Sequence, residues 1–327
     1  MPNYSGVWSL TAQMQSLKSG TWQTELPGDL GICYGHYTGT AATRRGVQYV
    51  LISSTGNATD YVDLTDGYSS RPAGWGTATR GGIGGGEKYN DDDGAKTDRI
   101  EYHVMANGGN LTSFGSLSAA KQNFSALSNG TRAVFCGGQT PSQINVMEYI
   151  TTATLGDVTD FGDLSQTTLG GCSASGTTRG MSHLGRGGSG SSVNVMEYIT
   201  VGSTGNSTDF GDSSVVCFKG FMANSSVRMT HTLGASSSIV DTIEYYTIAS
   251  TGNATDFGDL TVAGVEDVCG TGNATRGVRF GGVNGGTTYN IIDYITFGST
   301  GDASDFGDLT AATKDNAAAS NCHGGLS

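Results

Sequence analysis

Short apolar runs alternate with polar, turn-forming runs along the chain, and one arrangement of them recurs. A stretch such as Val195–Thr200 (VMEYIT) is rich in β-branched and aromatic residues, which is typical of a strand. A second aromatic residue follows the tyrosine of this stretch, always 12 positions later, whereas successive units are spaced by 47 to 53 residues. The segment between the two aromatics is therefore one structural piece, and insertions fall elsewhere. The six pairs are Tyr49/Tyr61, Tyr102/Phe114, Tyr149/Phe161, Tyr198/Phe210, Tyr245/Phe257 and Tyr294/Phe306.

Each unit predicts four short strands. The polar run STGNSTD at 203–209 holds residues that accept positive φ or form side-chain turns, which favours a hairpin, and FGD begins the returning strand. Another strand ending in glycines precedes the tyrosine, as in Arg132–Gly138 (RAVFCGG), and a weaker apolar stretch such as Leu260–Gly270 precedes that strand. Four-stranded units at this period are typical of β-propeller blades, so we expect an all-β, six-bladed propeller.

The two ends of the repeat array are complementary. The first unit offers a second strand, Leu30–Gly39, but little for a first strand, whereas the tail Leu309–Ser327 resembles the start of a further unit that does not continue. A tail strand that completes the first blade would leave no open sheet edge. We therefore expect residues 30–327 to form a propeller whose ring is closed by the C-terminal strand.

Residues 1–29 lie outside the repeat and are expected to form an N-terminal arm. Ser5–Trp22 contains a short helical pattern with Ser9 as its N-cap and Gly20 just past its end. Two uses of the arm stay open: a plug or clasp against the propeller, or a segment that docks on a partner. The candidate partner-contacting residues are Trp8, Leu10, Met14, Leu17 and Trp22.

Composition narrows the class of protein. Charged residues make up 14% of the chain, glycines number 53 and prolines 4, which does not suit a helical repeat. The formal net charge is −12, so a nucleic-acid partner is not expected. The sequence has no apolar run long enough for membrane insertion and no visible secretory signal.

The cysteines and histidines do not suggest a cofactor. The six cysteines fall about one per unit, in predicted first or second strands, and equivalent sites in neighbouring blades are generally too far apart for a disulfide. We expect free buried thiols. His183 and His231 lie in equivalent second strands, but no two histidines have close metal-ligand spacing in the sequence, so neither a metal site nor a cofactor is predicted.

Several repeated motifs have structural interpretations. The DFG sequence occurs at the same place in four units, without the other kinase motifs, and is interpreted as turn residues beside a packed aromatic. Repeated Thr-Arg pairs, such as Thr178-Arg179, are expected to bridge blades, although an arginine ring could instead bind an anion or a sugar. The N-x-S/T triplets are interpreted as turns rather than glycosylation sites.

The longest insertion lies in the second unit and is the candidate recognition site. It contains an acidic run, Asn90–Asp98 (NDDDGAKTD), whose order does not match an EF-hand loop, so a solvated acidic loop is expected rather than a calcium site. Loops that differ between blades are the usual place for binding. The candidate binding residues are Trp75, Tyr89, Asp91, Asp92 and Asp93.

The repeat also resembles known proteins. Paired glycines followed by a tyrosine and a later aromatic are similar to kelch repeats and to the central domain of galactose oxidase, although the later aromatic is Phe or Tyr in place of Trp. The strings Thr275–Gly282 (TRGVRFGG) and Ile243–Thr261 (IEYYTIASTGNATDFGDLT), with both chain ends, resemble kelch-like repeat proteins of tailed bacteriophages, especially those of marine cyanobacteria. The copper ligands and Tyr–Cys cofactor of galactose oxidase have no counterpart in this sequence.

The phage resemblance implies a non-enzymatic structural protein located in the virion, in the tail, its fibres or a surface decoration. Its expected partners are other virion proteins and a host cell-surface glycan or protein, and multiple copies are expected in the assembly. Two alternatives stay open. One is a glycan-degrading hydrolase or lyase, which would need paired carboxylates converging on one pocket. The other is an architectural protein that only cements subunits.

Overall fold

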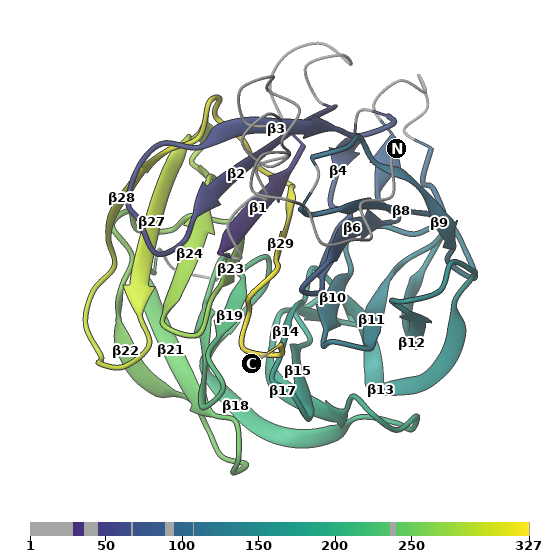
Figure 1. The fold of residues 1–327 in the computed structure, drawn as a ribbon. Coiled ribbons are helices and arrows are strands. Elements are labelled where there is room, and N and C mark those ends of the chain that lie inside the picture. Colours follow the sequence, from purple (N-terminus) through teal and green to yellow (C-terminus); the bar gives the residue numbers. More distant parts are fainter. Residues whose placement is uncertain are drawn as a thin grey trace, which may run out of the picture.

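The described residues form a ring of six antiparallel sheets, as the repeat predicts (Figure 1). The computed structural model describes residues 29–35, 45–66, 68–88, 95–106, 108–235 and 240–326. Within these ranges no helix has the length and apolar character that a membrane span requires. The prediction of an all-β, six-bladed propeller is confirmed.

Each blade has four principal strands, which follow one another from the channel outwards. Blade 1 comprises β29 (Ala317–Ser320), β1 (Leu30–Tyr34), β2 (Gly46–Leu51) and β3 (Thr59–Asp63); blade 2 comprises β5 (Ala73–Gly76), β6 (Arg80–Gly84), β8 (Arg99–Val104) and β9 (Thr112–Ser116); blade 3 comprises β10 (Ser125–Ser128), β11 (Arg132–Gln139), β12 (Gln143–Thr151) and β13 (Thr159–Leu169). Blade 4 comprises β14 (Cys172–Ser175), β15 (Arg179–His183), β17 (Val193–Thr200) and β18 (Thr208–Cys217); blade 5 comprises β19 (Met222–Asn224), β20 (Arg228–Thr232), β21 (Thr242–Thr247) and β22 (Thr255–Asp259); blade 6 comprises β23 (Cys269–Gly272), β24 (Arg276–Phe280), β27 (Ile291–Thr296) and β28 (Ser304–Asp308).

Three smaller pairings decorate the ring. The strands β4 (Tyr68–Ser70) and β7 (Glu87–Lys88) pair beside blade 2, and β25 (Val283–Asn284) pairs with β26 (Thr287–Thr288) in blade 6. The strand β16 (Arg186–Gly187) belongs to the fourth unit but pairs with β13 of blade 3. These additions lie outside the four principal strands of each unit, so they do not interrupt the repeated core.

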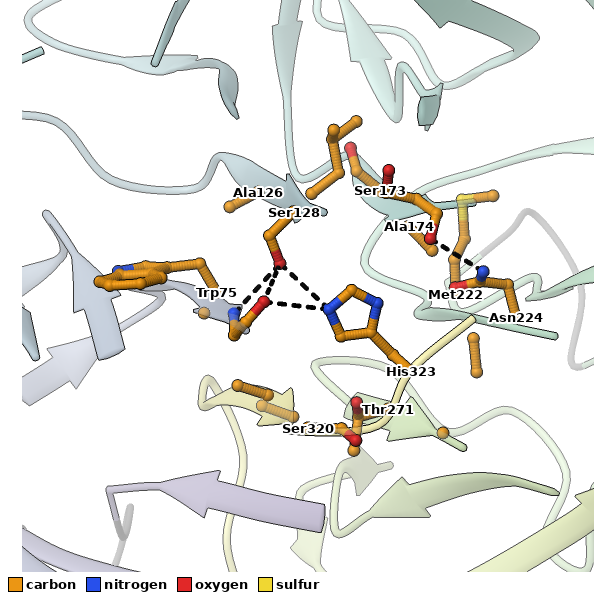
Figure 2. A pocket seen from close by; sticks show the side chains of 18 of the residues that line it. Trp75, Ala126, Ser128, Ser173, Ala174, Met222, Asn224, Thr271, Ser320 and His323 are labelled. Carbon is orange, nitrogen blue, oxygen red and sulfur yellow. Dashed lines mark hydrogen bonds between the residues drawn. The ribbon is translucent and has the colours of Figure 1, made fainter. Parts of the chain in front are cut away.

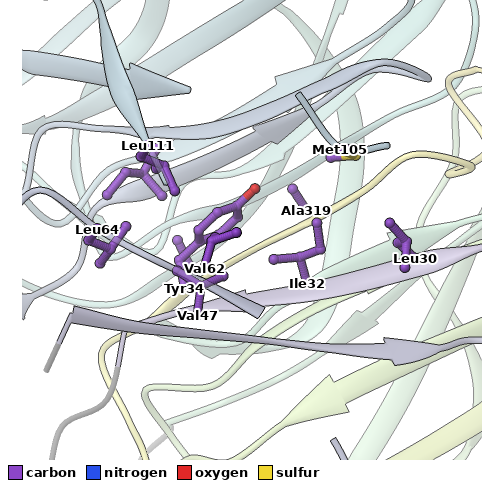
Figure 3. Close-up of a cluster of buried hydrophobic side chains, with 11 residues drawn as sticks. Leu30, Ile32, Tyr34, Val47, Val62, Leu64, Met105, Leu111 and Ala319 are labelled. Carbon is purple, nitrogen blue, oxygen red and sulfur yellow. The ribbon is translucent and has the colours of Figure 1, made fainter. Parts of the chain in front are cut away.

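The C-terminal strand closes the ring, which confirms the prediction from the incomplete first unit. The strand β29 pairs antiparallel with β1, with Gly31 opposite Ser320 and Tyr34 opposite Ala317 (Figure 1). The side-chain amide of Asn321 extends the pairing, because its Oδ1 accepts a hydrogen bond from the Leu30 amide at 2.8 Å. An apolar cluster buries this closure between blades 1 and 2 (Figure 3). Its members are Leu30, Ile32, Tyr34, Val47, Val62, Leu64, Ile83, Met105, Leu111, Ala317 and Ala319.

Each repeated arginine joins its own blade to the next. Arg179 lies over the ring of Tyr198 in blade 4, at 4.8 Å from the centroid, and its Nη1 donates 2.9 Å to the carbonyl oxygen of Ile248 in blade 5. The guanidinium is therefore both stacked and hydrogen-bonded, which lysine cannot reproduce. The structural interpretation of the Thr-Arg pairs is confirmed. The same two contacts are made by Arg80, Arg132, Arg228 and Arg276.

The repeated hairpin turn docks on the preceding blade. The Asn253 Oδ1 accepts 3.1 Å from the amide of Asp212, and the Gly252 amide donates 2.8 Å to the Phe210 carbonyl. The Gly252 carbonyl also lies so close to Gly211 that a Cβ there would be 2.4 Å away. The Asn side chain of the N-x-S/T triplet is thus a turn and docking group, as expected. The equivalent acceptors are Asn57, Asn110, Asp157, Asn206 and Asp302.

Candidate functional site at the variable face

The alternation of strand direction sorts the connections onto two faces of the ring. Turns between first and second strands, and hairpins between third and fourth strands, share one face, which we call the regular face. Every hairpin on it has the same length, because the fourth strand always begins eight residues after the third ends. Loops between second and third strands, and the connectors between blades, share the opposite face, which we call the variable face. The segments between these strands span 35–45, 85–98, 140–142, 184–192, 233–241 and 281–290, of which 36–44, 89–94 and 236–239 lie outside the described residues.

The central channel opens on the variable face through a ring of connector residues, one from each blade. Their φ values lie between +37° and +65°, a left-handed conformation that residues with a side chain adopt rarely. Among the described residues, five backbone hydrogen bonds link neighbours around the ring, at 2.8 to 3.1 Å. Such backbone persists only where surrounding structure enforces it. The members are Arg71, Asn123, Gly170, Lys219, Asp267 and Asp315.

Charged side chains hold this mouth together. Arg71 is ion-paired with Asp315 and with Asp267, whose Oδ1 is 2.5 Å from Nη2, and Arg71 also donates 2.6 Å to Asn123 Oδ1. Lys219 adds contacts of 3.1 Å to Asp267 and 3.2 Å to Glu266. The two cations are therefore engaged with neighbouring carboxylates, and one arginine joins four blades.

The mouth is too small to enclose a sugar or a nucleotide. Its cavity is about 70 Å³, whereas pockets for drug-sized ligands span roughly 300–1,000 Å³. A macromolecular partner or an extended glycan would instead rest across the variable face. This size favours surface recognition over a deep substrate pocket.

The elaborated second unit borders this mouth. The strand β4 leads directly into Arg71, and its partner β7 precedes the acidic insertion. The paired strands β4 and β7 therefore lie on the variable face. Lys96, on the far side of the insertion, donates 2.6 Å from Nζ to the carbonyl of Thr140 in blade 3. Tyr89, Asp91, Asp92 and Asp93 lie outside the described residues, as do the arm residues Trp8, Leu10, Met14, Leu17 and Trp22.

Trp75 does not lie on the surface of this loop. Its side chain is 1% exposed and packs in the blade core, with its ring edge-to-face against Phe114 at 5.4 Å. The strand β5 turns it inward because residues of a strand alternate between faces. The large apolar indole therefore stabilises blade 2, and the binding prediction for the second unit depends on the insertion alone.

The chain end occupies the other end of the channel, at the regular face (Figure 2). His323 points across the channel, with Nε2 at 3.0 Å from the Gly76 carbonyl and 3.4 Å from Ser128 Oγ. Burial lowers the pKa of His323, so the ring is held neutral. Gly324 and Gly325 approach the Ser225 and Ser175 carbonyls too closely for a Cβ. The tail therefore plugs the channel at this face.

Buried carboxylates recur one residue before the tyrosine in five of the units, but they are spread around the ring. Glu148 pairs with Lys121 at 2.7 Å and accepts from the Ser118 amide, and Glu197 accepts from Ser207 Oγ at 2.6 Å. Each of the two belongs to a different blade. Glycoside hydrolysis needs two carboxyl groups about 5–10 Å apart in one pocket. The buried carboxylates lie in separate blades, so their placement does not favour this reaction. The set is Glu101, Glu148, Glu197, Glu244 and Asp293.

The six cysteines are free thiols, as predicted, but Cys322 is only partly buried, and Cys217 and Cys322 lie outside first and second strands. Cys217 lies at the end of β18, a fourth strand, not in a first or second strand. Cys322 follows β29, the first strand of blade 1. Cys33 and Cys269, from blades 1 and 6, bring their sulfurs within 3.8 Å, but they lie in β1, a second strand, and β23, a first strand, so the expectation for equivalent sites is not contradicted.

Two histidines that are far apart in the sequence meet in space. The rings of His183 and His231 have centroids 4.6 Å apart, and both lie near Cys172 and Cys217. Spacing along the chain missed this group, because its members come from two blades and are brought together only by ring packing. Among the described residues, Cys172, His183 and His231 form the cluster whose donor atoms are close enough to hold a metal ion.

Comparison of the sequence with protein-family models and with curated proteins finds no match. The assignment to a six-bladed β-propeller therefore depends on the sheet arrangement itself.

Proposed function

We propose that this chain is a non-enzymatic structural protein of a virion, in the tail, its fibres or a surface decoration. In this role it presents the variable face of a rigid propeller to the host surface or to a neighbouring virion protein. The observation that carries the proposal is the segregation of the loops. The loops that differ in length between blades lie on one face, around a mouth braced by ion pairs. Recognition is expected where loops vary on a fixed scaffold.

The rigidity of the ring supports a role in presentation. The closing strand, the arginine contacts and the docked hairpins repeat at the blade boundaries, so the loops project from a platform that is fixed on all sides. Recognition by a fixed surface costs less entropy on binding than recognition by mobile segments. The virion setting depends on the resemblance of the repeat string to phage kelch-like proteins.

Two sets of arginine substitutions at exposed positions would test which face binds. Ser142→Arg, Ser189→Arg and Thr287→Arg place bulk and charge on the variable face, whereas Leu155→Arg, Ser203→Arg and Val227→Arg do so on the regular face. Purified labelled protein is measured for binding to host cells and to purified particles. We expect the variable-face set to weaken binding by about tenfold or more, which is about 1.4 kcal/mol, and the regular-face set to leave it unchanged.

Three results would count against the proposal. Loss of binding confined to the regular-face set would place recognition on the wrong face. Turnover of capsular or cell-wall glycan by the purified protein would support the hydrolase or lyase alternative. Absence of the chain from purified particles, by immunogold labelling and mass spectrometry, would remove the virion role. Binding to particles but not to cells, unchanged by either set of arginine substitutions, would support the architectural alternative.

A further inference from the structure

The geometry points to a structural metal site between blades 4 and 5, in which Cys172, His183, Cys217 and His231 bind one Zn²⁺ ion. This inference does not depend on the virion role. The four residues come from β14, β15, the end of β18 and β20. They lie at the variable-face end of the blades, just before the connector that supplies Lys219 to the channel mouth.

Three of the donor residues, Cys172, His183 and His231, already form a close group, and Cys217 lies beside both histidines. Cys217 Sγ is 3.7 Å from His183 Nε2 and 4.0 Å from His231 Nε2, and donor atoms of Cys172, His183 and His231 lie within 4.8 Å of one another. In tetrahedral zinc, with Zn–S of about 2.3 Å and Zn–N of about 2.0–2.1 Å, sulfur and nitrogen ligands are separated by about 3.5 Å. The contraction needed is therefore small for these distances, within reach of small side-chain rotations.

The surroundings suit a closed structural site. All four side chains are buried, and Cys172 belongs to an apolar cluster that excludes water. Two cysteines and two histidines are a common ligand set of structural zinc. The apolar members are Met181, Met196, Phe210, Met222, Met229, Tyr246 and Ile248.

Charge balance favours zinc with these four ligands. Imidazole binds a metal ion in its neutral form, and cysteine binds it as the thiolate. When Zn²⁺ binds, each thiol releases one proton, and two thiolates neutralise the dication. The buried site is then neutral with the metal and without it.

The hydrogen bonds of His183 define what must change on binding. The Gly185 amide lies 3.2 Å from Nδ1, which directs Nε2 towards Ser213 and Cys217. Coordination through Nε2 moves the ring proton to Nδ1, so the Gly185 contact must lengthen. His231 Nδ1 has no hydrogen-bond partner among the described residues, so no hydrogen bond at this atom has to break when the ring shifts.

Simple packing does not explain the choice of residues. Cys172 and His183 are paired across β14 and β15. In three other blades, the two equivalent positions do not hold a cysteine and a histidine. Small or apolar residues occupy these positions instead, and none of them places an imidazole in the core. The equivalent pairs are Ala73/Gly84, Ser125/Cys136 and Cys269/Phe280.

The test uses the full chain, unfolded in reductant and chelator and then refolded with Zn²⁺ or Co²⁺, because the site is buried. We expect one metal ion per chain, release of two protons per zinc in weakly buffered solution, and tetrahedral, thiolate-ligated cobalt absorption. Cys172→Ser and Cys217→Ser should abolish the thiolate-to-cobalt charge-transfer signal of the lost sulfur and weaken zinc binding by at least about 100-fold. Cys136→Ser, a buried thiol outside the cluster, is the matched control.

The wild-type measurements decide the outcome if a variant fails to fold. Folded, reduced wild-type chain that binds no zinc, or that binds zinc without releasing protons, would overturn the inference, since carboxylate binding releases none at neutral pH. Equal loss of binding in Cys136→Ser would also overturn it. His231→Gln provides a second variant that leaves both thiols in place, and its zinc affinity should fall by a similar factor.

Discussion

At the scale of single residues, the repeated positions are defined by contacts across blade boundaries. Gly211 illustrates this, because its φ is +147° and the Gly252 carbonyl of the next hairpin would lie 2.4 Å from a Cβ. The glycine of each FGD sequence therefore reflects close approach of a neighbouring turn. The interpretation of DFG as turn residues is wrong, because Asp209, Phe210 and Gly211 lie in β18 and pair with β17. The sequence pattern could not show that the adjacent blade requires the glycine.

Gly211→Ala is expected to lower the free energy of unfolding by about 1–3 kcal/mol, because the added methyl forces the docked hairpin away. Gly202→Ala is the matched control in the same unit, since nothing lies within 4 Å of its Cβ position. Urea denaturation of the two variants and the wild type measures the difference. Equal destabilisation by both variants would contradict the docking argument.

Buried histidines make the stability depend on pH. Burial lowers the pKa of His103 to about 4, while Nε2 stays 2.9 Å from the hydroxyl of Tyr34. The unfolded chain takes up a proton below about pH 6.5, whereas the folded chain resists it until about pH 4. The contribution of His103 is therefore fully favourable above about pH 6.5 and is lost as pH falls towards 4.

His103→Gln should remove this part of the pH dependence. We expect the wild type to lose about 2 kcal/mol more than the variant between pH 7.5 and pH 5. Chemical denaturation at both values measures the effect in each protein. Because His183, His231 and His323 also have lowered pKa values, the variant should keep a reduced slope. If the free energy of unfolding changed equally with pH in the two proteins, His103 would take up a proton at pH 5 as readily in the folded chain as in the unfolded chain.

At the scale of elements, most strands could be predicted from the sequence because they recur in every repeat unit. The four strands of a unit, the hairpin and the closing strand β29 follow from periodic aromatics and an incomplete first unit. The short pairings do not, because β16 leaves its own unit to pair with β13 and carries only two residues. The cluster of Cys172 with His183 and His231 was missed for a related reason: its partners are set by packing between blades, which periodicity within a unit does not encode.

Removal of residues 311–327 should abolish the closed ring. The truncated chain loses β29 and exposes an edge of β1, so we expect a loss of about 5 kcal/mol or more, comparable to the whole stability of many domains. Truncation after Asn321 is the control, because it keeps β29 and the Asn321 contact but removes the His323 plug. Circular dichroism and denaturation compare the two. Restoration of the fold by a peptide of residues 311–321 would support the assignment, and an unaffected 1–310 chain would refute it.

At the scale of the whole molecule, the mouth of the channel joins blades that are distant in sequence. Arg71 in the connector to blade 2 contacts Asn123, Asp267 and Asp315, which precede blades 3, 6 and 1. The sequence pattern identified the acidic insertion of the second unit but not this ring, because its members share a backbone conformation and not a residue type. Because these positions carry Arg, Lys, Asn, Asp and Gly, the shared backbone conformation does not produce a recognisable sequence motif.

Arg71→Gln should destabilise the fold by about 2 kcal/mol at pH 7. The expected loss is smaller than the roughly 3–5 kcal/mol of a fully buried pair, since the Arg71 side chain is 22% exposed. Lys88→Gln is the control, because its pair with Asp66 is longer, at 3.6 Å, and part-exposed, so a change within about 0.5 kcal/mol is expected. Adding Asp315→Asn to Arg71→Gln should recover part of the loss. Denaturation midpoints that do not separate these variants would exclude a bracing role for the mouth.

The separation of regular and variable faces has a consequence for redesign. The repeated contacts that hold one blade to the next run through the arginines, the docked hairpins and the closing strand, none of which lies in the loops between second and third strands. The bond from Lys96 to the Thr140 carbonyl is a further contact, which joins the loops of blades 2 and 3. Foreign peptides could therefore be inserted at 188–190 or 285–286, where the chain is exposed at the surface, without touching these contacts. Several different peptides could be displayed side by side on one protein, at spacings fixed by the geometry of the ring.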